Sequence, residues 1–590
     1  MSFLATFNAD GVPIDNEMIG PLRGETERHL KLVGRSRQTA LMWSDPDMDL
    51  EDRDVRHAVE LDGQLWLLGR VRLDRRGDLC ALLGASEAES DALLCLRTYA
   101  RWGECCLDHL RGDFCFVLWD ERRRELFCAR DQLGVRPLFY GRANNSWFVG
   151  DSLDAVARAS GLTGELDDFW IADYLMGALC LDFDRTVYKH VKRLAPAHTL
   201  VASRDGGAAK RYWSLEFEEP IFYRRRGQYL DHFHDVLARA IKDRLPPGCV
   251  GISMSGGLDS TTLAAKTVEI TGDTSRVVAF TRYFESLIPD EERYFSALAA
   301  GRLGISHILH ATDDAYDLQL TDLLVHTHEP GGPSVARTSE RAVETKMANA
   351  AKVWFIGEGP DNALTFEWPA HLRWLVRHRD WPRLLAALGQ YIRGKEIREW
   401  LMTIKNLRSP RPETGGRIQT GFPEWLDKDF AEPLDLVSRA RRLTESMRQN
   451  ESWRPGGTTS FASPAWQTYF EHYDSTFSGT SLDIRHPYVD LEVLSFMLRT
   501  PPIPWGRRKH LIREAMRGRL PDEVLARDKA PLVVDPNTKI VRKTPLPLLS
   551  IDPALRRFID PGRLPDAAQS GIDTLDKVRM LDAWLKGRLQ

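Results

Sequence analysis

Residues 251–260 read GISMSGGLDS, and this stretch decides the fold of the second half of the chain. An apolar run from Val250 to Met254 ends abruptly in Ser-Gly-Gly, and a helical pattern of apolar residues continues to Val268. This order predicts a strand, a tight glycine turn and a helix N-terminus. Unpaired N–H groups and the helix dipole at such a turn favour a bound phosphate. An ordinary strand-to-helix connection without a ligand is the alternative interpretation.

The side chains of this turn also suit a nucleotide. Gly256 and Gly257 allow the backbone to approach phosphates closely, because no Cβ intrudes. Ser255 and Ser260 offer hydroxyl donors, and Asp259 is placed to hold Mg2+ against phosphate oxygens. Neither a Walker loop nor a dinucleotide fingerprint is present in this stretch. SGGLDS instead resembles the signature of the ATP-pyrophosphatase fold, and this resemblance implies an adenylating enzyme that uses ATP and Mg2+.

Bulk composition narrows the class of protein. The 590 residues are 43% hydrophobic and 28% charged, which is typical of a globular protein with two or more domains. A net charge of −4 argues against a general nucleic-acid binder, and no apolar run is long enough to span a bilayer. We therefore expect a cytoplasmic protein with neither nucleic-acid nor membrane partners. Six cysteines between Cys80 and Cys128 lack metal-binding spacing and predict buried free thiols.

Residues 1–215 predict a first domain. Apolar strands are expected at 64–71, 110–120 and 125–130, with an amphipathic helix at 91–102. The order from YARWG through LRGDFCFVLWD to ARDQLGVRPLFY resembles the glutaminase domain of class II amidotransferases, as found in asparagine synthetases. The resemblance implies an α+β sandwich of the Ntn-hydrolase type.

The departures from that family predict an inactive glutaminase. The family places a nucleophilic cysteine directly after the initiator methionine, whereas this chain has Ser2 and no cysteine before Cys80. The family's asparagine-glycine-glutamate segment, which holds glutamine, aligns with Leu68-Gly69-Arg70. A serine hydroxyl is a poor nucleophile without a strong base beside it. We expect this domain to serve as a structural partner of the other half.

Residues 216–590 predict an α/β domain of the ATP-pyrophosphatase type with a parallel sheet and helical additions. A buried strand is expected at 277–281, further strands are expected at 305–309 and 353–356, and Pro289 is expected to open a helix. The last of these strands leads into GEGPD, residues 357–361, which resembles the family's GEGSD. The resemblance implies that Gly357 contacts the nucleotide, Glu358 takes part in catalysis and Asp361 is the second magnesium ligand. An exposed acidic turn is the alternative.

Further motifs lie towards the C-terminus. The pattern predicts an amphipathic helix over 505–516, and the loop RDKAPL follows at 527–532. In the family, the lysine at the position of Lys529 reaches the α phosphate and the reacting carboxyl carbon, which makes it the expected electrostatic catalyst. The segment TSLDIRHPYVD, residues 480–490, also resembles the family and suggests a buried ion pair or a capped turn. Catalysis by Arg485 or Asp490 is the alternative there.

Two regions of the sequence allow alternative interpretations. Glu471, His472 and Asp474 compete with Glu358 for an acid–base role, because one helix could direct them towards a substrate. The Arg- and Trp-rich stretch 364–453 matches no known motif. Packing and solvated helix faces explain its composition, and a peptide-binding groove is the sharper alternative.

The asparagine synthetase family includes branches without the glutaminase cysteine, and this chain is most similar to its lasso-peptide cyclases. That resemblance implies adenylation of an Asp or Glu side chain in a precursor peptide, followed by ring closure by the peptide's own N-terminal amine. It also implies a leader peptidase and a leader-recognition protein as partners. An ammonia-dependent asparagine synthetase or a β-lactam synthetase-like enzyme is the runner-up, and an inactive scaffold is the third class.

Overall fold

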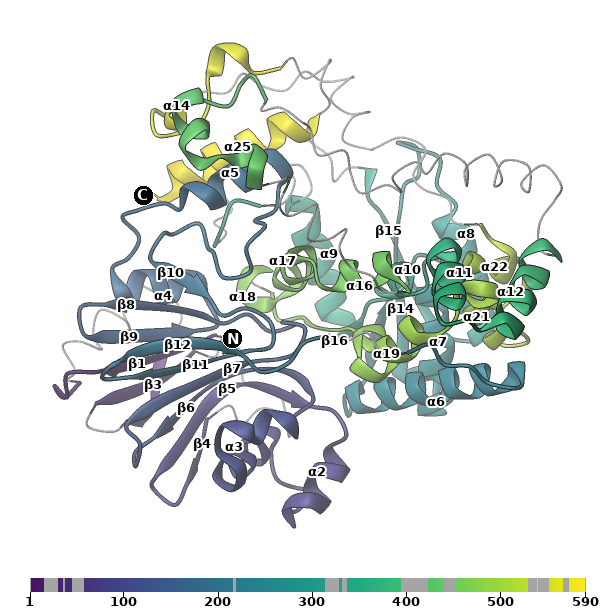
Figure 1. The fold of residues 1–590 in the computed structure, drawn as a ribbon, viewed down its shortest axis with the longest axis horizontal. Coiled ribbons are helices and arrows are strands. Elements are labelled where there is room, and N and C mark those ends of the chain that lie inside the picture. The colour runs from purple at the N-terminus through teal and green to yellow at the C-terminus, as the bar shows by residue number, and fades with distance from the viewer. Residues whose placement is uncertain are drawn as a thin grey trace.

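The computed structural model describes residues 2–14, 30–35, 38–44, 58–215, 219–313, 328–331, 337–393, 423–439, 441, 453–478, 480–528, 539, 551–565 and 572–588. Figure 1 shows two bodies side by side, a β-rich body that begins with the N-terminus and an α/β body that follows it. The C-terminal helix returns to the first body.

The first body is a sandwich of two antiparallel sheets, as predicted. In spatial order, one sheet holds β10 (Val191–Arg193), β8 (Phe139–Ala143), β9 (Ser146–Gly150), β1 (Ser2–Asn8), β3 (Thr39–Ser44) and β2 (Leu30–Arg35). The other holds β12 (Gly206–Arg211), β11 (His198–Ser203), β7 (Glu125–Arg130), β6 (Gly112–Asp120), β5 (Leu65–Leu73) and β4 (Ala58–Leu61). Phe3, Phe7 and Trp119 are among the side chains that fill the space between the sheets. The expected strands and the helix at 91–102 are all present.

The second body is built on a parallel sheet of five strands. Their spatial order is β15 (Ser306–Ala311), β14 (Val277–Tyr283), β13 (Val250–Ser253), β16 (Val353–Phe355) and β17 (Asp483–Arg485). Strand β13 is therefore central, and its carboxyl end delivers the SGGLDS turn. Gly251 is required within it, because a Cβ there would lie 2.3 Å from the ring of Trp354 on the neighbouring strand.

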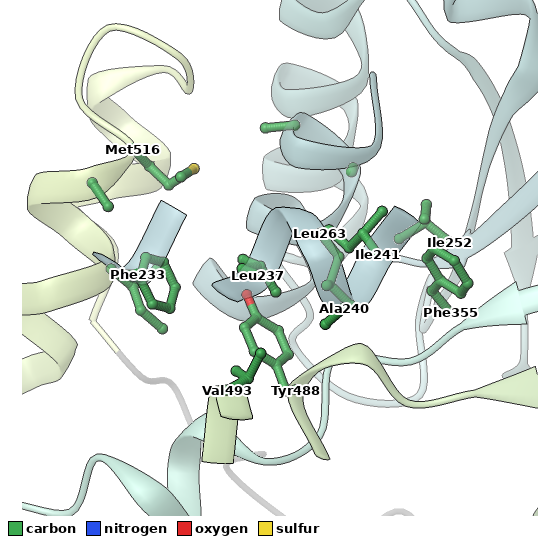
Figure 2. Packing of buried hydrophobic residues seen from close by; sticks show 14 of the residues in the cluster. Phe233, Leu237, Ala240, Ile241, Ile252, Leu263, Phe355, Tyr488, Val493 and Met516 are labelled. Atoms are coloured by element: carbon green, nitrogen blue, oxygen red, sulfur yellow. The ribbon is translucent and has the colours of Figure 1, made fainter. Parts of the chain in front are cut away.

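Helices cover this sheet and bury its apolar residues. Figure 2 shows Ile241 of α6 packing near Leu263 of α7 and Phe355 of β16, while Phe233 of α6 lies beside Met516. The described helices of this body are α6 (Arg226–Arg244), α7 (Leu258–Thr271), α8 (Glu292–Leu303), α9 (Arg337–Ala350), α10 (Pro360–Ala363), α11 (Trp368–Arg377), α12 (Trp381–Arg393), α16 (Pro455–Phe461), α17 (Pro464–Tyr473), α18 (Ser475–Ser478), α19 (Leu491–Arg499), α20 (Pro502–Trp505), α21 (His510–Ala515) and α22 (Asp522–Ala526).

The remaining helices belong with the first body. They are α2 (Arg76–Leu83), α3 (Asp91–Trp102), α4 (Leu153–Ser160), α5 (Asp168–Gly177), α14 (Lys428–Ala431) and α25 (Ile572–Arg588). Helix α25 lies beside α5, and Trp584 packs with Tyr188 in one apolar cluster (Figure 1). Helix α25 thus adds its apolar side chains to the core of the first body.

Two further expectations concern membrane-spanning segments and the cysteines. The described helices include none that is both long and apolar enough to cross a bilayer. Of the six cysteines between Cys80 and Cys128, five are buried free thiols, but Cys105 is exposed. It lies in the short 3-10 segment after α3, which turns its side chain outward while Cys106 points into the core.

Candidate active site

The SGGLDS turn forms as predicted between β13 and α7. Gly256 adopts a positive φ of 68°, and a Cβ there would lie 2.5 Å from the backbone nitrogen of Ser296, so only glycine fits. The hydroxyl of Ser260 accepts a hydrogen bond from the backbone N–H of Ser255 at 3.2 Å and donates to the carbonyl of Gly257 at 3.3 Å. These bonds close the turn around the N-terminus of α7.

The GEGPD loop lies against this turn. A Cβ at Gly357 would be only 3.0 Å from the backbone nitrogen of Ser260, so the two loops are in close contact. Beside them lies a cavity of about 650 Å³. The predicted site residues that line it are Ser255, Gly257, Asp259, Ser260, Gly357, Glu358 and Asp361. Gly256 supports the turn from behind, where it packs on α8.

Lys509 joins the two predicted magnesium ligands. Its ammonium group pairs with Asp259 and lies 2.6 Å from Oδ1 of Asp361. Burial raises the pKa of Asp259 to about 6; Lys509 opposes this shift, and the charges of Asp361 and Glu358 add to it. Burial also acts to lower the pKa of Lys509, but the two carboxylates outweigh it and raise that pKa. One cation thus balances two converging carboxylates.

Lys509 was not singled out from the sequence, because the helix predicted over 505–516 is interrupted. Helix α20 ends at Trp505, and Arg508 and Lys509 both adopt left-handed backbone angles, with φ of 50° and 53°. Helix α21 begins only at His510. This turn sends the side chain of Lys509 to the carboxylates, where a continuous helix would have directed it elsewhere. The basic run at 507–509 was the only signal in the sequence.

Two more arginines organise the cavity. Arg513 donates from Nε to the carbonyl of Arg508 and from Nη2 to that of Arg527, each at 2.7 Å, and so joins two cavity-lining segments. Arg527 donates to the carbonyl of Ser255 at 3.2 Å, and its guanidinium lies 4.4 Å from the ring centre of Phe295. Such stacking holds a cation in a fixed position. Arg527 therefore places positive charge beside the phosphate-binding turn.

The residues present fit a magnesium ion. Oδ1 of Asp259 is buried and has no hydrogen-bond partner among the described residues, while Asp361 faces the same cation. Within the described ranges, no group of three or more His, Cys, Asp or Glu side chains is arranged to hold a metal. The two carboxylates would thus hold Mg2+ jointly, with the remaining oxygen ligands supplied by phosphates and water.

Comparisons with known proteins agree with this geometry. Residues 232–558, more than half of the chain, match the family described as asparagine synthase. The chain belongs to the asparagine synthase family. It is therefore an ATP-dependent, AMP-forming carbon–nitrogen ligase. Residues 47–213 match the glutamine amidotransferase domain, so the first body is the glutaminase-like domain and the second is the synthetase domain.

Several curated relatives are similar over most of their length. Asparagine synthetase [glutamine-hydrolyzing] 3 of Bacillus subtilis is 25% identical over 494 residues, which cover 78% of this chain and 73% of that protein. A putative asparagine synthetase [glutamine-hydrolyzing] of Mycobacterium bovis is 25% identical over 520 residues, with coverages of 83% and 76%. Amidase chyE of Penicillium rubens is 24% identical over 489 residues, with coverages of 74% and 71%.

The glutaminase-like domain carries an ion-pair cluster beside Ser2. The hydroxyl of Ser2 donates to Asp151 at 2.8 Å, and Asp151 lies 3.5 Å from the guanidinium of Arg70. Arg70 also donates to Asp474 of the synthetase domain at 2.7 Å. Arg70 stands where the family's glutamate is expected, and in this chain it is almost fully buried. An arginine that joins the two domains therefore occupies this position.

The alternative that Glu471 or Asp474 faces the substrate is wrong, because neither side chain points into the cavity. Oε1 of Glu471 pairs with Arg130 at 3.1 Å and with Arg193 at 2.9 Å, so it faces the glutaminase-like domain. Asp474 faces the same domain through Arg70. Helix α17 turns these carboxylates away from the cavity, and its last residue, Tyr473, lines the cavity instead. His472 contacts the ring of Phe477 and does not line the cavity.

Of the remaining predicted positions, some have structural roles and others lie outside the described residues. Asp490 caps α19 by accepting hydrogen bonds from two backbone N–H groups and pairs with Arg244 at 3.0 Å. Arg485 bonds Asp483 at 2.7 Å, so the structural interpretation of 480–490 is confirmed. Lys529 lies outside the described residues, as does much of the Arg- and Trp-rich stretch. Within that stretch, Trp425 and Trp453 are buried in packing, whereas Trp381 is exposed.

Proposed function

We propose that this enzyme is a lasso-peptide macrolactam synthetase. It adenylates the side-chain carboxylate of an Asp or Glu in a precursor peptide and releases pyrophosphate. The peptide's N-terminal amine then attacks the activated carboxyl carbon, AMP leaves, and the amine loses a proton, which yields an isopeptide bond. Holding both ends of one peptide makes the attack unimolecular, and this can supply much of the rate.

The observation that carries this proposal is the buried Arg70 at the expected glutamine-binding position. Arg70 pairs with Asp151 and Asp474 at the position where the family resemblance expects the carboxylate that holds glutamine. An amide-forming enzyme without glutamine as its nitrogen source must use another amine, and we propose that this amine belongs to the peptide substrate itself. Supporting this, the cavity has an apolar wall formed by Met347, Tyr473, Leu482 and Ile484, which suits peptide side chains better than free aspartate and ammonia.

ATP and Mg2+ are the cofactors of this proposal. Bound together, they supply the adenylyl group and a charge-neutralised pyrophosphate leaving group. The SGGLDS turn would bind phosphate through its N–H groups, and Asp259 and Asp361 would hold the metal. Glu358, which is exposed and lines the cavity, would accept a proton from the attacking amine. Lys529 would stabilise developing negative charge at the reacting centre.

The test is an incubation of the enzyme with ATP, Mg2+ and a leader-free core peptide that has a free N-terminal amine and an Asp or Glu several residues on. The proposal expects AMP, pyrophosphate and a peptide lighter by one water, with fragmentation placing the new bond between the N-terminus and an acidic side chain. A core peptide with an acetylated N-terminus is the matched control, because its carboxylate can be activated but its amine cannot attack. AMP formation from aspartate and ammonia, without peptide dehydration, would establish the runner-up.

A further inference from the structure

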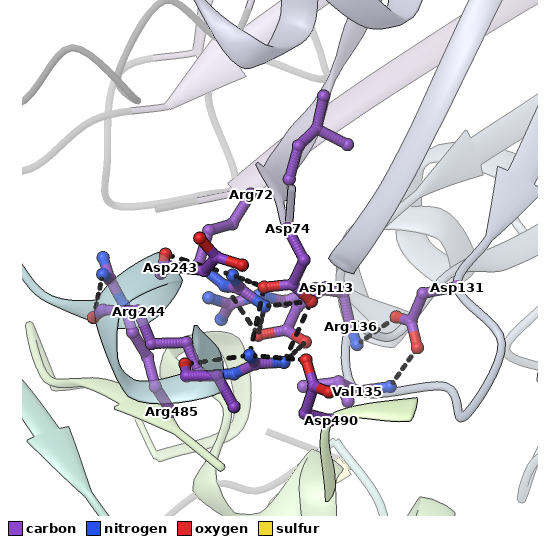
Figure 3. A network of polar contacts seen from close by, with 12 residues as sticks. Arg72, Asp74, Asp113, Asp131, Val135, Arg136, Asp243, Arg244, Arg485 and Asp490 are labelled. Carbon is purple, nitrogen blue, oxygen red and sulfur yellow. Dashed lines mark hydrogen bonds and ion pairs between the residues drawn. The ribbon is translucent and has the colours of Figure 1, made fainter. Parts of the chain in front are cut away.

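One part of the interface between the two domains is built from arginines of the glutaminase-like domain and carboxylates of the synthetase domain. Elsewhere the polarity is reversed, since Arg244 of the synthetase domain pairs with Asp74 of the other domain at 3.0 Å. In the first part the arginines and Asp474 are buried, and the other carboxylates are half-buried. The pairs are Arg70–Asp474 at 2.7 Å, Arg136–Asp474 at 3.4 Å, Arg136–Asp483 at 2.7 Å, Arg130–Glu471 at 3.1 Å, Arg193–Glu471 at 2.9 Å and Arg193–Glu329 at 2.6 Å. Figure 3 shows the adjoining part of this network, in which Arg136 lies near the cluster around Arg244.

Two carboxylates of this interface, Asp474 and Asp483, are direct sequence neighbours of residues that line the cavity. Tyr473 immediately precedes Asp474 and lines the cavity. Leu482 and Ile484 also line it, whereas Asp483 between them points to Arg136. This is the alternation expected along β17, where successive side chains face opposite sides of the sheet. The same short segment thus faces the substrate on one side and the glutaminase-like domain on the other.

Asp474 fixes the turn at the start of this wall. Burial alone would raise its pKa, but Arg70 and Arg136 outweigh burial and hold that pKa well below its usual range. The resulting carboxylate also accepts hydrogen bonds from the backbone N–H of Thr476 at 2.9 Å and from its hydroxyl at 2.8 Å. If the arginines were removed, the buried carboxylate of Asp474 would lose its main partners. Leaving such a charge buried and unpaired strongly destabilises the local structure, so the segment should shift or open.

We propose that Arg70 and Arg136 are positioning residues for the substrate cavity. Through Asp474 and Asp483 they hold the cavity wall formed by Tyr473, Leu482 and Ile484, so the glutaminase-like domain shapes a site on the other domain. This inference rests on the assignment of the 650 Å³ cavity as the substrate site. It does not depend on whether the substrate is a peptide, because the wall is the same for any substrate.

Hydrogen–deuterium exchange of the full-length protein tests this proposal without any substrate. In Arg70→Met, we expect the amides of 473–478 and 480–484 to exchange at least tenfold faster than in the wild type. The affinity for a non-hydrolysable ATP analogue with Mg2+ should change less than twofold, because the SGGLDS turn touches neither arginine. Arg70→Lys keeps the positive charge but has fewer hydrogen-bond donors. Its wall amides should therefore exchange at a rate between those of the wild type and Arg70→Met. Arg136→Lys provides a second mild variant in case Arg70→Met fails to fold.

The matched control is Arg439→Met. Arg439 also joins distant segments, since its Nη2 bonds Asp173 at 2.7 Å and Asp182 at 2.9 Å in the glutaminase-like domain, but it does not line the cavity. It should leave exchange at 473–484 unchanged. Unaltered exchange of the wall in Arg70→Met, or an equal increase in Arg439→Met, would overturn the proposal.

Once a carboxylate substrate is identified, a kinetic comparison extends this test. Arg70→Lys should lower kcat at least tenfold with little change in the KM for ATP. If no peptide is cyclised by the wild type, the proposed function fails while the exchange experiment still decides the positioning role. The peptide-cyclisation assay thus tests the proposed function, and the exchange experiment separately tests the positioning role of the arginines.

Discussion

Asp259 is expected to destabilise the ligand-free enzyme at neutral pH. Burial raises its pKa to about 6 from an ordinary value of 3.8, despite the opposing effect of Lys509. A carboxyl group with a raised folded-state pKa leaves stability intact below its unfolded pKa and costs stability as pH rises through the folded value. A difference of about 2 pKa units corresponds to about 3 kcal/mol at pH 7 and above. Since the side chain retains 15% exposure, we take about 2 kcal/mol as the working value.

The perturbation is Asp259→Asn, which keeps the shape and removes the charge. We expect the thermal midpoint of the synthetase domain to rise by roughly 2–5 °C at pH 8 in buffer without Mg2+ or nucleotide. The gain should fall to about half at pH 5 and to about a fifth at pH 4, and it should vanish only when Asp259 is protonated in the unfolded state as well. Pyrophosphate release should be abolished in the same variant. Added Mg2+ and ATP should stabilise the wild type more than the variant.

Asp528→Asn is the control for this experiment. Asp528 pairs with Arg508 near the same cavity, but its side chain is 76% exposed, and such surface pairs contribute about 0–1 kcal/mol. Its midpoint should stay within about 1 °C of the wild type at every pH. A midpoint for Asp259→Asn that falls at pH 8, or rises equally at all pH values, would refute the reasoning. The pair with Lys509 would then be a net stabiliser, and Asp259 would not be held at a cost for metal binding.

Three further predictions concern the chemistry. Asp361→Asn should abolish pyrophosphate release across a magnesium titration, because half of the carboxylate charge at the metal is lost; full turnover would show the ligand assignment to be wrong. Lys529→Ala should reduce turnover by several orders of magnitude with little change in ATP affinity, since a lost transition-state donor costs about 3 kcal/mol or more. Proportional loss of ATP binding would make it a phosphate anchor instead. Purified enzyme should release no glutamate from glutamine, and Ser2→Cys should not restore this activity while Arg70 remains; glutamate release at the rate of ATP turnover would contradict this.

The fold was largely predictable because its determinants are local. Strands β13, β14, β15 and β16 are short apolar runs bounded by glycine or polar turns, and each was expected within a few residues of its observed bounds. The SGGLDS and GEGPD turns follow directly from β13 and β16. Parallel pairing of these two strands places both turns at one edge of the sheet. The meeting of Asp259 with Asp361 therefore followed from the order of elements alone.

Lys509 could not be predicted by the same reasoning. The pattern over 505–516 has helical periodicity, and periodicity carries no signal for two consecutive left-handed residues of ordinary type. The turn at 508–509 is held by tertiary contacts, among them the pair with Asp259 and the bond from Arg513 to the carbonyl of Arg508. Contacts between residues 250 positions apart are invisible to local patterns. The direction of Glu471 and Asp474 was missed for the same reason, since their arginine partners lie in the other domain.

Arg70 connects a departure from the family's glutamine-binding sequence with the geometry of the synthetase cavity. As a sequence feature it is a departure that removes a glutamine-binding carboxylate. In the structure, the same side chain supplies a buried cation to Asp474, which anchors the wall of the synthetase cavity. Reverting Arg70 to a carboxylate would place a third negative group beside Asp151 and Asp474 in a buried site, where like charges strongly oppose one another. The chain therefore cannot regain the family's carboxylate at this position without weakening the interface that Arg70 now forms. That coupling would tie the glutaminase-like domain to the synthetase cavity whether or not the first domain carries out any chemistry of its own.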